Sequence, residues 1–323
     1  MRRAPHRASH PPLTGGYLVR DAATRMDEAA LDAAWGESGA RLVRLRGGEI
    51  ALRAFEAEKT AALDLIPVTG ERGPRHYYLG RADGAPRFAV LEDPERPAGE
   101  PPAAGWGNPF EVGSWLDPLE AETMAVAFAL VAWHGSAPFS PRDGRPTEPA
   151  QGGWARLDEH GGEHFPRNDP VVIVLVEHEG RALLGSNVLW ETGRFSLLAG
   201  FVEAGESAEH AVAREIEEES GARVDDIRYV TSQPWPFPRS FMLGFRARLA
   251  PGSDPAALAP DPTELSELRW FSRDELRTPP PGIRLPMPMS IARWLIDQWV
   301  AEGDEADIDA ADRDAAGAGA DGS

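Results

Sequence analysis

One short segment, residues 200–221, constrains the fold of this chain more than any other. It begins with a glycine-rich turn, Gly200-Phe-Val-Glu-Ala-Gly205, and continues as a glutamate-rich run. Ser207 is a typical helix N-cap and Gly221 a typical helix stop, so the pattern predicts a helix over residues 207–220. The turn brings backbone carbonyls and amides to the start of that helix, where they can reach a metal or a phosphate.

Three glutamates share one face of the predicted helix. Glu215, Glu218 and Glu219 stand at positions i, i+3 and i+4, and the apolar stripe of Val212 and Ile216 runs immediately beside them. A solvated acidic face is the ordinary interpretation of a glutamate-rich helix, but these acids flank the buried side instead of opposing it. Clustered charges beside a core repel one another and are costly to desolvate, and a divalent cation removes both penalties. Oxygen ligands favour Mg²⁺ or Mn²⁺.

The segment resembles the signature of the Nudix hydrolases, G-x5-E-x7-R-E-U-x-E-E-x-G-U, in which U is a bulky aliphatic residue. The fixed positions are matched by Gly200, Glu206, Arg214, Glu215, Ile216, Glu218, Glu219 and Gly221. Only the last position departs, with Ala222 where a larger aliphatic residue is usual. The resemblance implies metal-dependent hydrolysis of a nucleoside diphosphate linked to another moiety.

By the same resemblance, the groups that bind the metal ions and carry catalysis are the carbonyl of Ala199 and the carboxylates of Glu215, Glu218, Glu219 and Glu264. Glu206 and Arg214 would support the loop and the helix. Glu218 and Glu264 both remain candidates for the general base. For Glu264, the alternative interpretation is a surface acid that precedes a strand.

A second motif, Ser232-Gln-Pro-Trp-Pro-Phe-Pro-Arg-Ser240, follows the first along the chain. Its alternating prolines predict a stiff, extended segment. It is similar to the S-Q-P-W-P-F-P-x-S signature of the NADH pyrophosphatase branch of Nudix enzymes. The resemblance implies that the dinucleotide is contacted by Gln233, Pro234, Trp235, Pro236, Phe237, Pro238, Arg239, Ser240 and Ala292. Phe165 and Phe201 are candidates to stack on a nicotinamide or adenine ring, and equally candidates for the core.

The expected reaction is therefore hydrolysis of the pyrophosphate bond of NADH or NAD⁺ to nicotinamide mononucleotide and AMP, with Mg²⁺ or Mn²⁺ as cofactor. Removal of an NAD cap from RNA would break the same bond. The first alternative is a broader Nudix hydrolase that acts on other conjugates, for example ADP-ribose. The second is a non-catalytic NAD-sensing protein, which the complete set of box carboxylates disfavours.

The chain contains no cysteine, which excludes disulfides, thiolate metal sites and a cysteine nucleophile. Most of the NADH pyrophosphatase branch carries four zinc-binding cysteines between its two halves. The corresponding positions here are Ser140, Asp143, Leu157 and His160. We predict that no structural zinc is bound, that Asp143 and His160 are surface residues, and that packing or dimer contacts order this module. A homodimer is expected.

The predicted fold class is α+β: a Nudix α/β/α sandwich, preceded by an α+β N-terminal domain and a short zinc-ribbon-like module without zinc. The predicted segments are a disordered start (1–13), an N-terminal Nudix-like domain (14–134), the degenerate zinc-ribbon module (135–167), the Nudix hydrolase domain (168–300) and an acidic disordered tail (301–323).

Local patterns support this division of the chain. Alternating strands predict hairpins within residues 42–52 and 76–91, and Asp117-Pro118 opens a helix that runs to about His134. Residues 290–300 predict a last amphipathic helix.

Charge and hydropathy restrict the partners. The chain has 33 Lys and Arg against 52 Asp and Glu, a net charge of −19, which argues against duplex DNA as the main partner because phosphate binding needs a basic surface. Nowhere do about 18 apolar residues follow one another, so no membrane span is expected. The basic start lacks the apolar run of a secretory signal. A soluble, cytoplasmic protein is therefore expected.

Overall fold

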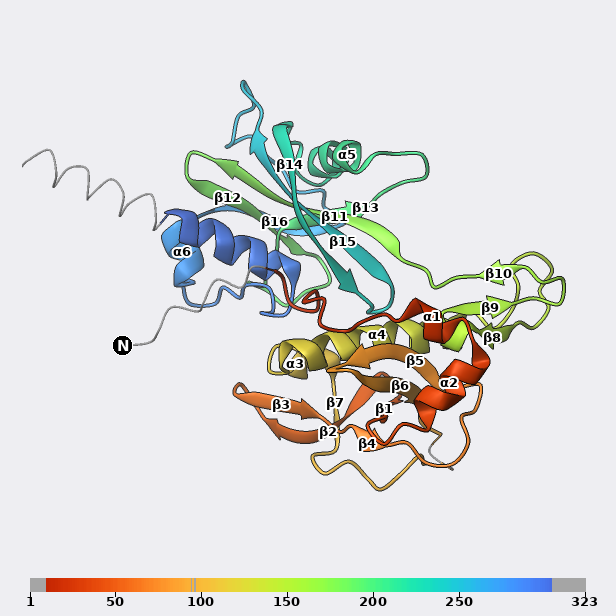
Figure 1. Ribbon diagram of the computed structural model, residues 1–323. Helices are drawn as coiled ribbons and strands as arrows, with labels where there is room; N and C mark the ends of the chain where they lie inside the picture. Colours follow the sequence, from red (N-terminus) through yellow and green to blue (C-terminus); the bar gives the residue numbers. More distant parts are fainter. Residues whose placement is uncertain (1–9, 94, 96, 304–323) are drawn as a thin grey trace, which may run out of the picture. The chain divides into compact units, whose positions relative to one another are not determined.

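The computed structural model describes residues 10–93, 95 and 97–303, and the chain divides into two compact units (Figure 1). The N-terminal unit consists of Pro12–Asp169 together with Gln233–Phe241. The C-terminal unit contains Pro170–Ser232 and the part of the chain from Met242 onward. No helix among the described residues is long and apolar enough to cross a membrane.

The two predicted disordered ends lie mostly outside the described residues. Of the start, residues 10–13 are described, and Leu13 is buried. Of the acidic tail, residues 301–303 are described, and they continue the helix that begins at residue 291. The helix predicted over residues 290–300 is therefore confirmed and extends a little further.

The N-terminal unit is built on a seven-stranded sheet with the order β3-β2-β1-β6-β5, in which β4 pairs with β1 and β7 pairs with β2. Its strands are β1 (Arg41–Arg46), β2 (Glu49–Glu56), β3 (Thr60–Leu63), β4 (Ile66–Pro67), β5 (Tyr77–Ala82), β6 (Ala85–Leu91) and β7 (Trp106–Gly107). The antiparallel pairs β1–β2 and β5–β6 confirm both predicted hairpins.

Four helices accompany this sheet: α1 (Ala22–Arg25), α2 (Glu28–Trp35), α3 (Pro109–Val112) and α4 (Pro118–Ser136). The helix predicted to open at Asp117-Pro118 is α4. The Asp117 carboxylate accepts hydrogen bonds from the backbone N–H groups of Leu119 and Glu120, so it caps two donors that the first turn leaves free. The helix contacts strands β1, β5 and β6 and is apolar around most of its surface.

A small sheet of β8 (Glu148–Ala150), β9 (Ala155–Leu157) and β10 (Glu163–His164), with the 3₁₀ turn η1 (Gln151–Gly153), forms the region predicted as a degenerate zinc ribbon. Its interior is polar. Buried Arg156 donates to Thr147 Oγ1 at 2.6 Å, and its Nη1 lies 2.8 Å from His134 Nδ1. His134 Nε2 in turn lies 2.8 Å from the Gly153 carbonyl oxygen. The module thus contains a buried hydrogen-bond network, and its ordering by packing or by dimer contacts stays a prediction.

The C-terminal unit contains a six-stranded sheet with the order β14-β15-β11-β12-β16, in which β13 pairs with β11. Its elements are β11 (Asp169–His178), β12 (Arg181–Asn187), β13 (Leu198–Phe201), α5 (Ala208–Ser220), β14 (Val224–Trp235), β15 (Ser240–Leu249), β16 (Leu265–Ser272), α6 (Arg273–Arg277) and the helix of residues 291–303. Figure 1 shows the helices in the green and blue parts of the chain.

The central strand β11 explains why this unit is a sandwich. Successive side chains of a strand point to opposite faces. Val172, Val174 and Val176 pack with the buried residues of α5, whereas Ile173 and Leu175 pack with the helix of residues 291–303. Both faces of the sheet are thus covered by helix, and the predicted α/β/α arrangement is confirmed.

Candidate active site

Helix α5 has the ends that its sequence predicts. The Ser207 hydroxyl accepts a hydrogen bond from the backbone N–H of His210, and Gly221 ends the helix with φ 69°, a left-handed conformation that favours glycine. Ala211, Val212 and Ile216 are buried against the sheet. The helix therefore holds its carboxylates in a fixed rotation about the edge of the core.

Glu219 is the carboxylate closest to the core. Its exposed fraction is only 6%, and Oε2 has no hydrogen-bond partner among the residues that the structure describes. The backbone N–H of Ala199 donates to this carboxylate, but burial, followed by the charges of Glu215 and Glu264, raises the pKa of Glu219 to about 8. A buried oxygen with no donor is costly unless a cation or a proton occupies the space beside it.

Glu215 occupies space that the backbone of the turn leaves open. A Cβ atom on Gly200 would lie 1.8 Å from the carboxyl carbon of Glu215, so any side chain larger than hydrogen at position 200 would displace the carboxylate. Burial raises the pKa of Glu215, and its bond to Arg214 opposes that shift. The glycine of the motif thus makes room for the glutamate of the helix.

Arg214 ties the turn to the helix. Its Nε and Nη2 donate to the two oxygens of Glu206 at 2.9 and 2.8 Å, and Nη2 also donates to the carbonyl of Phe201. Its Nη1 donates to Glu215 at 2.8 Å and to Glu218 at 3.0 Å. Arg214 holds the pKa of Glu206 at about 2. Because the guanidinium is planar, this bidentate arrangement fixes position as well as charge.

Glu264 reaches the same site from the segment before β16. Backbone hydrogen bonds from Asp261 to the Glu219 carbonyl, and from Ala259 to the Ser220 carbonyl, hold this segment against the end of α5. The negative charge of Glu264 contributes to the raised pKa of both Glu215 and Glu219. The structure therefore places the four predicted carboxylates near one another, and the Ala199 N–H contacts one of them, Glu219.

This donor set fits a divalent cation. Glu215 and Glu218 share the Arg214 guanidinium, the charge of Glu264 acts on Glu215 and Glu219, and one buried oxygen of Glu219 lacks a hydrogen-bond donor among the described residues. All the available side-chain donors are oxygens, which are the ligands that Mg²⁺ and Mn²⁺ prefer.

Three predicted substrate contacts lie outside the proline-rich signature: Phe165, Phe201 and Ala292. Their side chains differ in exposure. Phe201 ends β13 in the C-terminal unit and is 58% exposed, while Phe165 in the N-terminal unit is 56% exposed. The alternative that these two rings belong to the core is therefore wrong. Ala292, in contrast, is buried with Ile291 and Leu295 in the core of the C-terminal unit.

The signature over residues 232–240 is not extended throughout. Strand β14 ends at Trp235, residues 236–239 form a turn, and β15 begins at Ser240. The prediction of a continuous extended segment is wrong for the turn, because Arg239 folds back to form an ion pair with Asp169 at 2.5 Å and its carbonyl accepts a hydrogen bond from the Asp169 N–H.

Within the N-terminal unit the signature packs against helices. The Phe237 ring lies 5.0 Å from that of Phe110 and 5.3 Å from that of Phe128, measured between centroids. Gln233 is buried, and its Nε2 donates to the Pro12 carbonyl at 2.7 Å. A pocket beside the turn is lined by α4 and by residues 167–168, 234–236 and 238–240.

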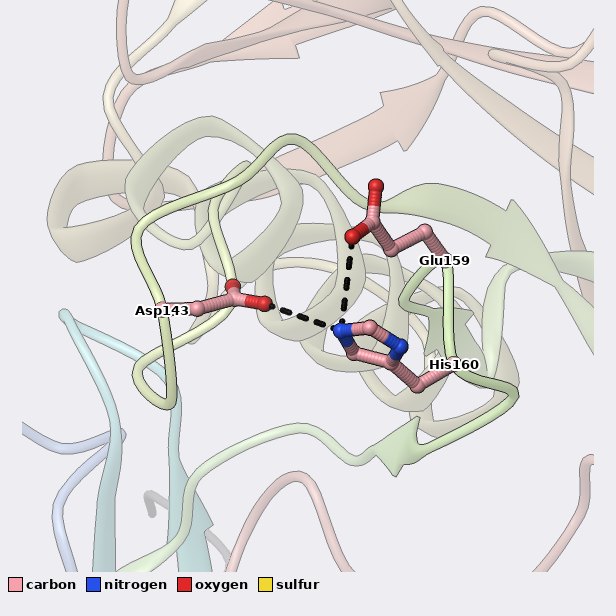
Figure 2. Close-up of side chains that lie close together, drawn as sticks. All are labelled: Asp143, Glu159 and His160. Carbon is pink, nitrogen blue, oxygen red and sulfur yellow. Dashed lines mark ion pairs between the residues drawn. The ribbon is translucent and has the colours of Figure 1, made fainter.

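A second group of candidate ligands lies in the small sheet region. Asp143, Glu159 and His160 gather their ligand atoms within 4.8 Å of one another (Figure 2). His160 Nε2 lies 3.4 Å from Asp143 Oδ2 and 3.3 Å from Glu159 Oε1, and Glu159 also forms an ion pair with Arg145. Asp143 and His160 are exposed, as predicted.

The group includes one acid, Glu159, that the comparison with zinc-binding cysteines does not predict. Glu159 was missed because it occupies none of the four positions compared with cysteines, although it directly precedes His160. Ser140 is buried and Leu157 is exposed. The prediction that no structural zinc is bound remains a prediction.

Comparison with known proteins agrees with the carboxylate site. The NUDIX domain family matches residues 166–291. NAD-capped RNA hydrolase NudC of Mycobacterium bovis (strain BCG / Pasteur 1173P2) is 40% identical over 307 residues, which cover 88% of this chain and 94% of the relative, and NudC of Mycobacterium tuberculosis (strain ATCC 25618 / H37Rv) gives the same values. NudC of Salmonella paratyphi C (strain RKS4594) is 42% identical over 174 residues, 53% of this chain and 63% of the relative. The chain therefore belongs to the Nudix hydrolases, in the branch of the NudC-type NADH pyrophosphatases.

Proposed function

We propose that this protein hydrolyses the pyrophosphate bond of NADH and NAD⁺ to nicotinamide mononucleotide and AMP, and that it removes NAD caps from RNA by breaking the same bond. The observation that carries the proposal is the four-carboxylate site on and beside α5, with the unpartnered buried oxygen of Glu219. The relatives named NAD-capped RNA hydrolase support the choice of substrate.

The cation would be held by the Ala199 carbonyl, Glu215, Glu218, Glu219 and Glu264. When bound, Mg²⁺ or Mn²⁺ supplies charge neutralisation for the phosphates and lowers the pKa of an attacking water. The chain itself positions the proposed ligands, because the bonds between Arg214 and Glu206 fix the turn relative to the helix. Glu218 and Glu264 are both exposed, so a water can reach either carboxylate, and both are candidates to accept its proton.

The organic part of the substrate would be recognised by exposed rings and by the proline-rich signature. Phe201 is exposed two residues beyond Ala199, so its ring is available to stack on a base next to the metal site. Phe165, Ala292 and the signature residues Gln233–Ser240 are the remaining proposed substrate contacts, as the resemblance to the NADH pyrophosphatase branch implies. A homodimer and a cytoplasmic location, both expected from the sequence, belong to the same proposal.

The direct test is product analysis with the purified protein. NADH, NAD⁺, ADP-ribose and an NAD-capped oligoribonucleotide are incubated separately with Mg²⁺ or Mn²⁺, and the products are identified by chromatography. We expect AMP and reduced nicotinamide mononucleotide from NADH, with no turnover of NADH in Glu219→Gln. Glu217→Gln is the matched control, because Glu217 lies on the same helix but is exposed and outside the carboxylate group. Intact NADH with both metals would refute the proposal, and ADP-ribose as the preferred substrate would favour the broader Nudix activity.

A further inference from the structure

The loop that follows β12 in the C-terminal unit exposes three consecutive large apolar residues. Val188 is 42% exposed, Leu189 is 89% exposed and Trp190 is 36% exposed. Single exposed apolar residues are ordinary on protein surfaces, but a contiguous exposed patch indicates an interaction site. None of these three residues has a role in the proposed hydrolysis.

The loop is held in one conformation. The Leu189 N–H donates to the Asn187 side chain at 2.9 Å, and the Trp190 N–H donates to the Asn187 carbonyl at 3.0 Å. Further along, the Gly193 carbonyl accepts a hydrogen bond from Arg284. Gly193 has φ +84°, and a Cβ atom there would lie 2.0 Å from the Gly282 carbonyl oxygen, so the two segments approach closely. The exposed indole is therefore presented by an ordered backbone.

The same loop is hydrogen-bonded to the backbone of Glu264, one of the proposed metal ligands. The Val188 N–H donates to the backbone carbonyl of Glu264 at 2.9 Å. Two residues of chain span at most about 7 Å, so the backbone of Trp190 lies close to that of Glu264. A group bound at Trp190 would thus be a near neighbour of a phosphate bound at the carboxylates.

The chemistry of the patch suits a nucleotide. The guanidinium carbon of Arg194 lies 4.8 Å from the centroid of the Trp190 ring. Arg194 forms no ion pair within the described part of the chain, so its charge is available to a phosphate group. An aromatic ring combined with an arginine is the arrangement on which single-stranded nucleic acids stack their bases. Three residues are too few for a stable protein–protein interface.

We propose that Trp190 and Arg194 bind the first RNA nucleotide beyond the NAD cap, the base on the indole and its phosphate at the guanidinium. This inference rests on the proposed function and deepens it: the free dinucleotide has no such nucleotide, so the loop makes the enzyme distinguish capped RNA from NADH. The chain has a negative net charge, but the proposed contact involves a single nucleotide, and Arg194 supplies a positive charge at that point.

The test compares two substrates on one enzyme. In Trp190→Ala, we expect kcat/KM for an NAD-capped oligoribonucleotide to fall on the order of tenfold, as loss of one base stack implies, while kcat/KM for NADH changes less than about twofold. Trp190→Phe should recover part of the loss. The matched control is Tyr229→Ala, which removes another exposed ring of the same unit and should leave both substrates unchanged.

Three outcomes would overturn the inference. An equal loss for both substrates would assign the ring to the dinucleotide itself, and an unchanged RNA to NADH ratio would remove any role for the loop. A change in the oligomeric state of Trp190→Ala, measured by light scattering, would make the patch a contact between copies of the chain. All three outcomes concern the inference alone, because the wild-type protein would still hydrolyse NADH. If the wild-type protein did not hydrolyse NADH, the proposed function itself would be refuted.

Discussion

Two groups of carboxylates in this protein have similar composition and opposite physical situations. On α5, Glu215 and Glu218 share the guanidinium of Arg214, and a buried oxygen of Glu219 has no donor among the described residues. In the small sheet region, Asp143 and Glu159 are exposed and are accompanied by Arg145 and His160. The first group leaves a buried oxygen without a partner, whereas the second is exposed and forms an ion pair with Arg145. Burial and charge balance, rather than the number of acids, are what separate the proposed metal site from the ion-pair cluster.

The strongest test of this difference between the two groups is to remove one acid from each and to measure metal binding. Glu219→Gln should weaken Mn²⁺ binding at least about 100-fold, because even groups that only support metal ligands cost about 10–100-fold when changed. Glu159→Gln should leave Mn²⁺ affinity within about twofold. Calorimetric titration with Mn²⁺ measures the affinity of each variant.

A second readout guards against misfolding in that experiment. Since a buried carboxylate is costly without a cation, metal-free Glu219→Gln should melt at a higher temperature than metal-free wild type. A lower melting temperature, or an equal loss of Mn²⁺ affinity in Glu159→Gln, would contradict the distinction between the two groups.

The next largest effect concerns what orders the small sheet region. Burial lowers the pKa of His134 to about 4, below its usual value of 6.5. The unfolded chain therefore takes up a proton on this histidine between about pH 6.5 and about pH 4, while the folded chain does not. The free energy of unfolding should accordingly be highest above pH 6.5 and fall by up to ~3 kcal/mol as the pH drops towards 4. Urea unfolding at several pH values measures this loss.

Carboxylates also titrate in this pH range, so two histidine variants are needed to show that the loss of stability comes from His134. His134→Gln should flatten the pH dependence, and exposed His160→Gln should not. If wild type and His134→Gln lost stability in parallel, the buried network of His134 and Arg156 would not be what makes the module sensitive to acid.

A smaller effect is expected from the arginines. Arg214→Lys keeps a positive charge but loses the bidentate bond to Glu206, so NADH turnover should fall about 10–100-fold. Arg145→Lys, the matching change beside Glu159, should leave turnover within about twofold. Steady-state kinetics at saturating metal separates the two, and equal losses would show that the second cluster also supports catalysis.

The smallest expected effect is on zinc. Purified protein should contain well below one equivalent of zinc, because the second cluster is exposed and its Glu159 already pairs with Arg145, and His160→Ala should not change the zinc content. Elemental analysis by mass spectrometry measures the number of zinc ions per chain. One zinc ion per chain, lost in His160→Ala, would disprove the prediction made from the absent cysteines.

Much of the fold could be predicted because its signals are local. Asp117 and Ser207 begin helices with side chains that reach only two or three residues ahead, and Gly221 ends one through its own backbone angle. The carboxylate group was equally visible, since helix periodicity alone places Glu215, Glu218 and Glu219 together.

The remaining features depend on contacts between residues far apart in the chain. The turn after Trp235 follows from the ion pair of Arg239 with Asp169, and the burial of Gln233 from its bond to Pro12. Neither partner is indicated by periodicity or spacing. The exposed loop at Trp190 likewise became visible only when its exposed area and its bond to Glu264 were known.

Gly200 carries a practical consequence for anyone who maps this enzyme by mutation. It has no functional group, yet alanine at this position would claim the volume that the Glu215 carboxylate occupies. In every activity assay, such a variant would mimic the loss of the Glu215 carboxylate itself. A scan of single substitutions would therefore rank a residue without chemistry among the catalytic ones, and only a measurement of where Glu215 has moved would separate the two.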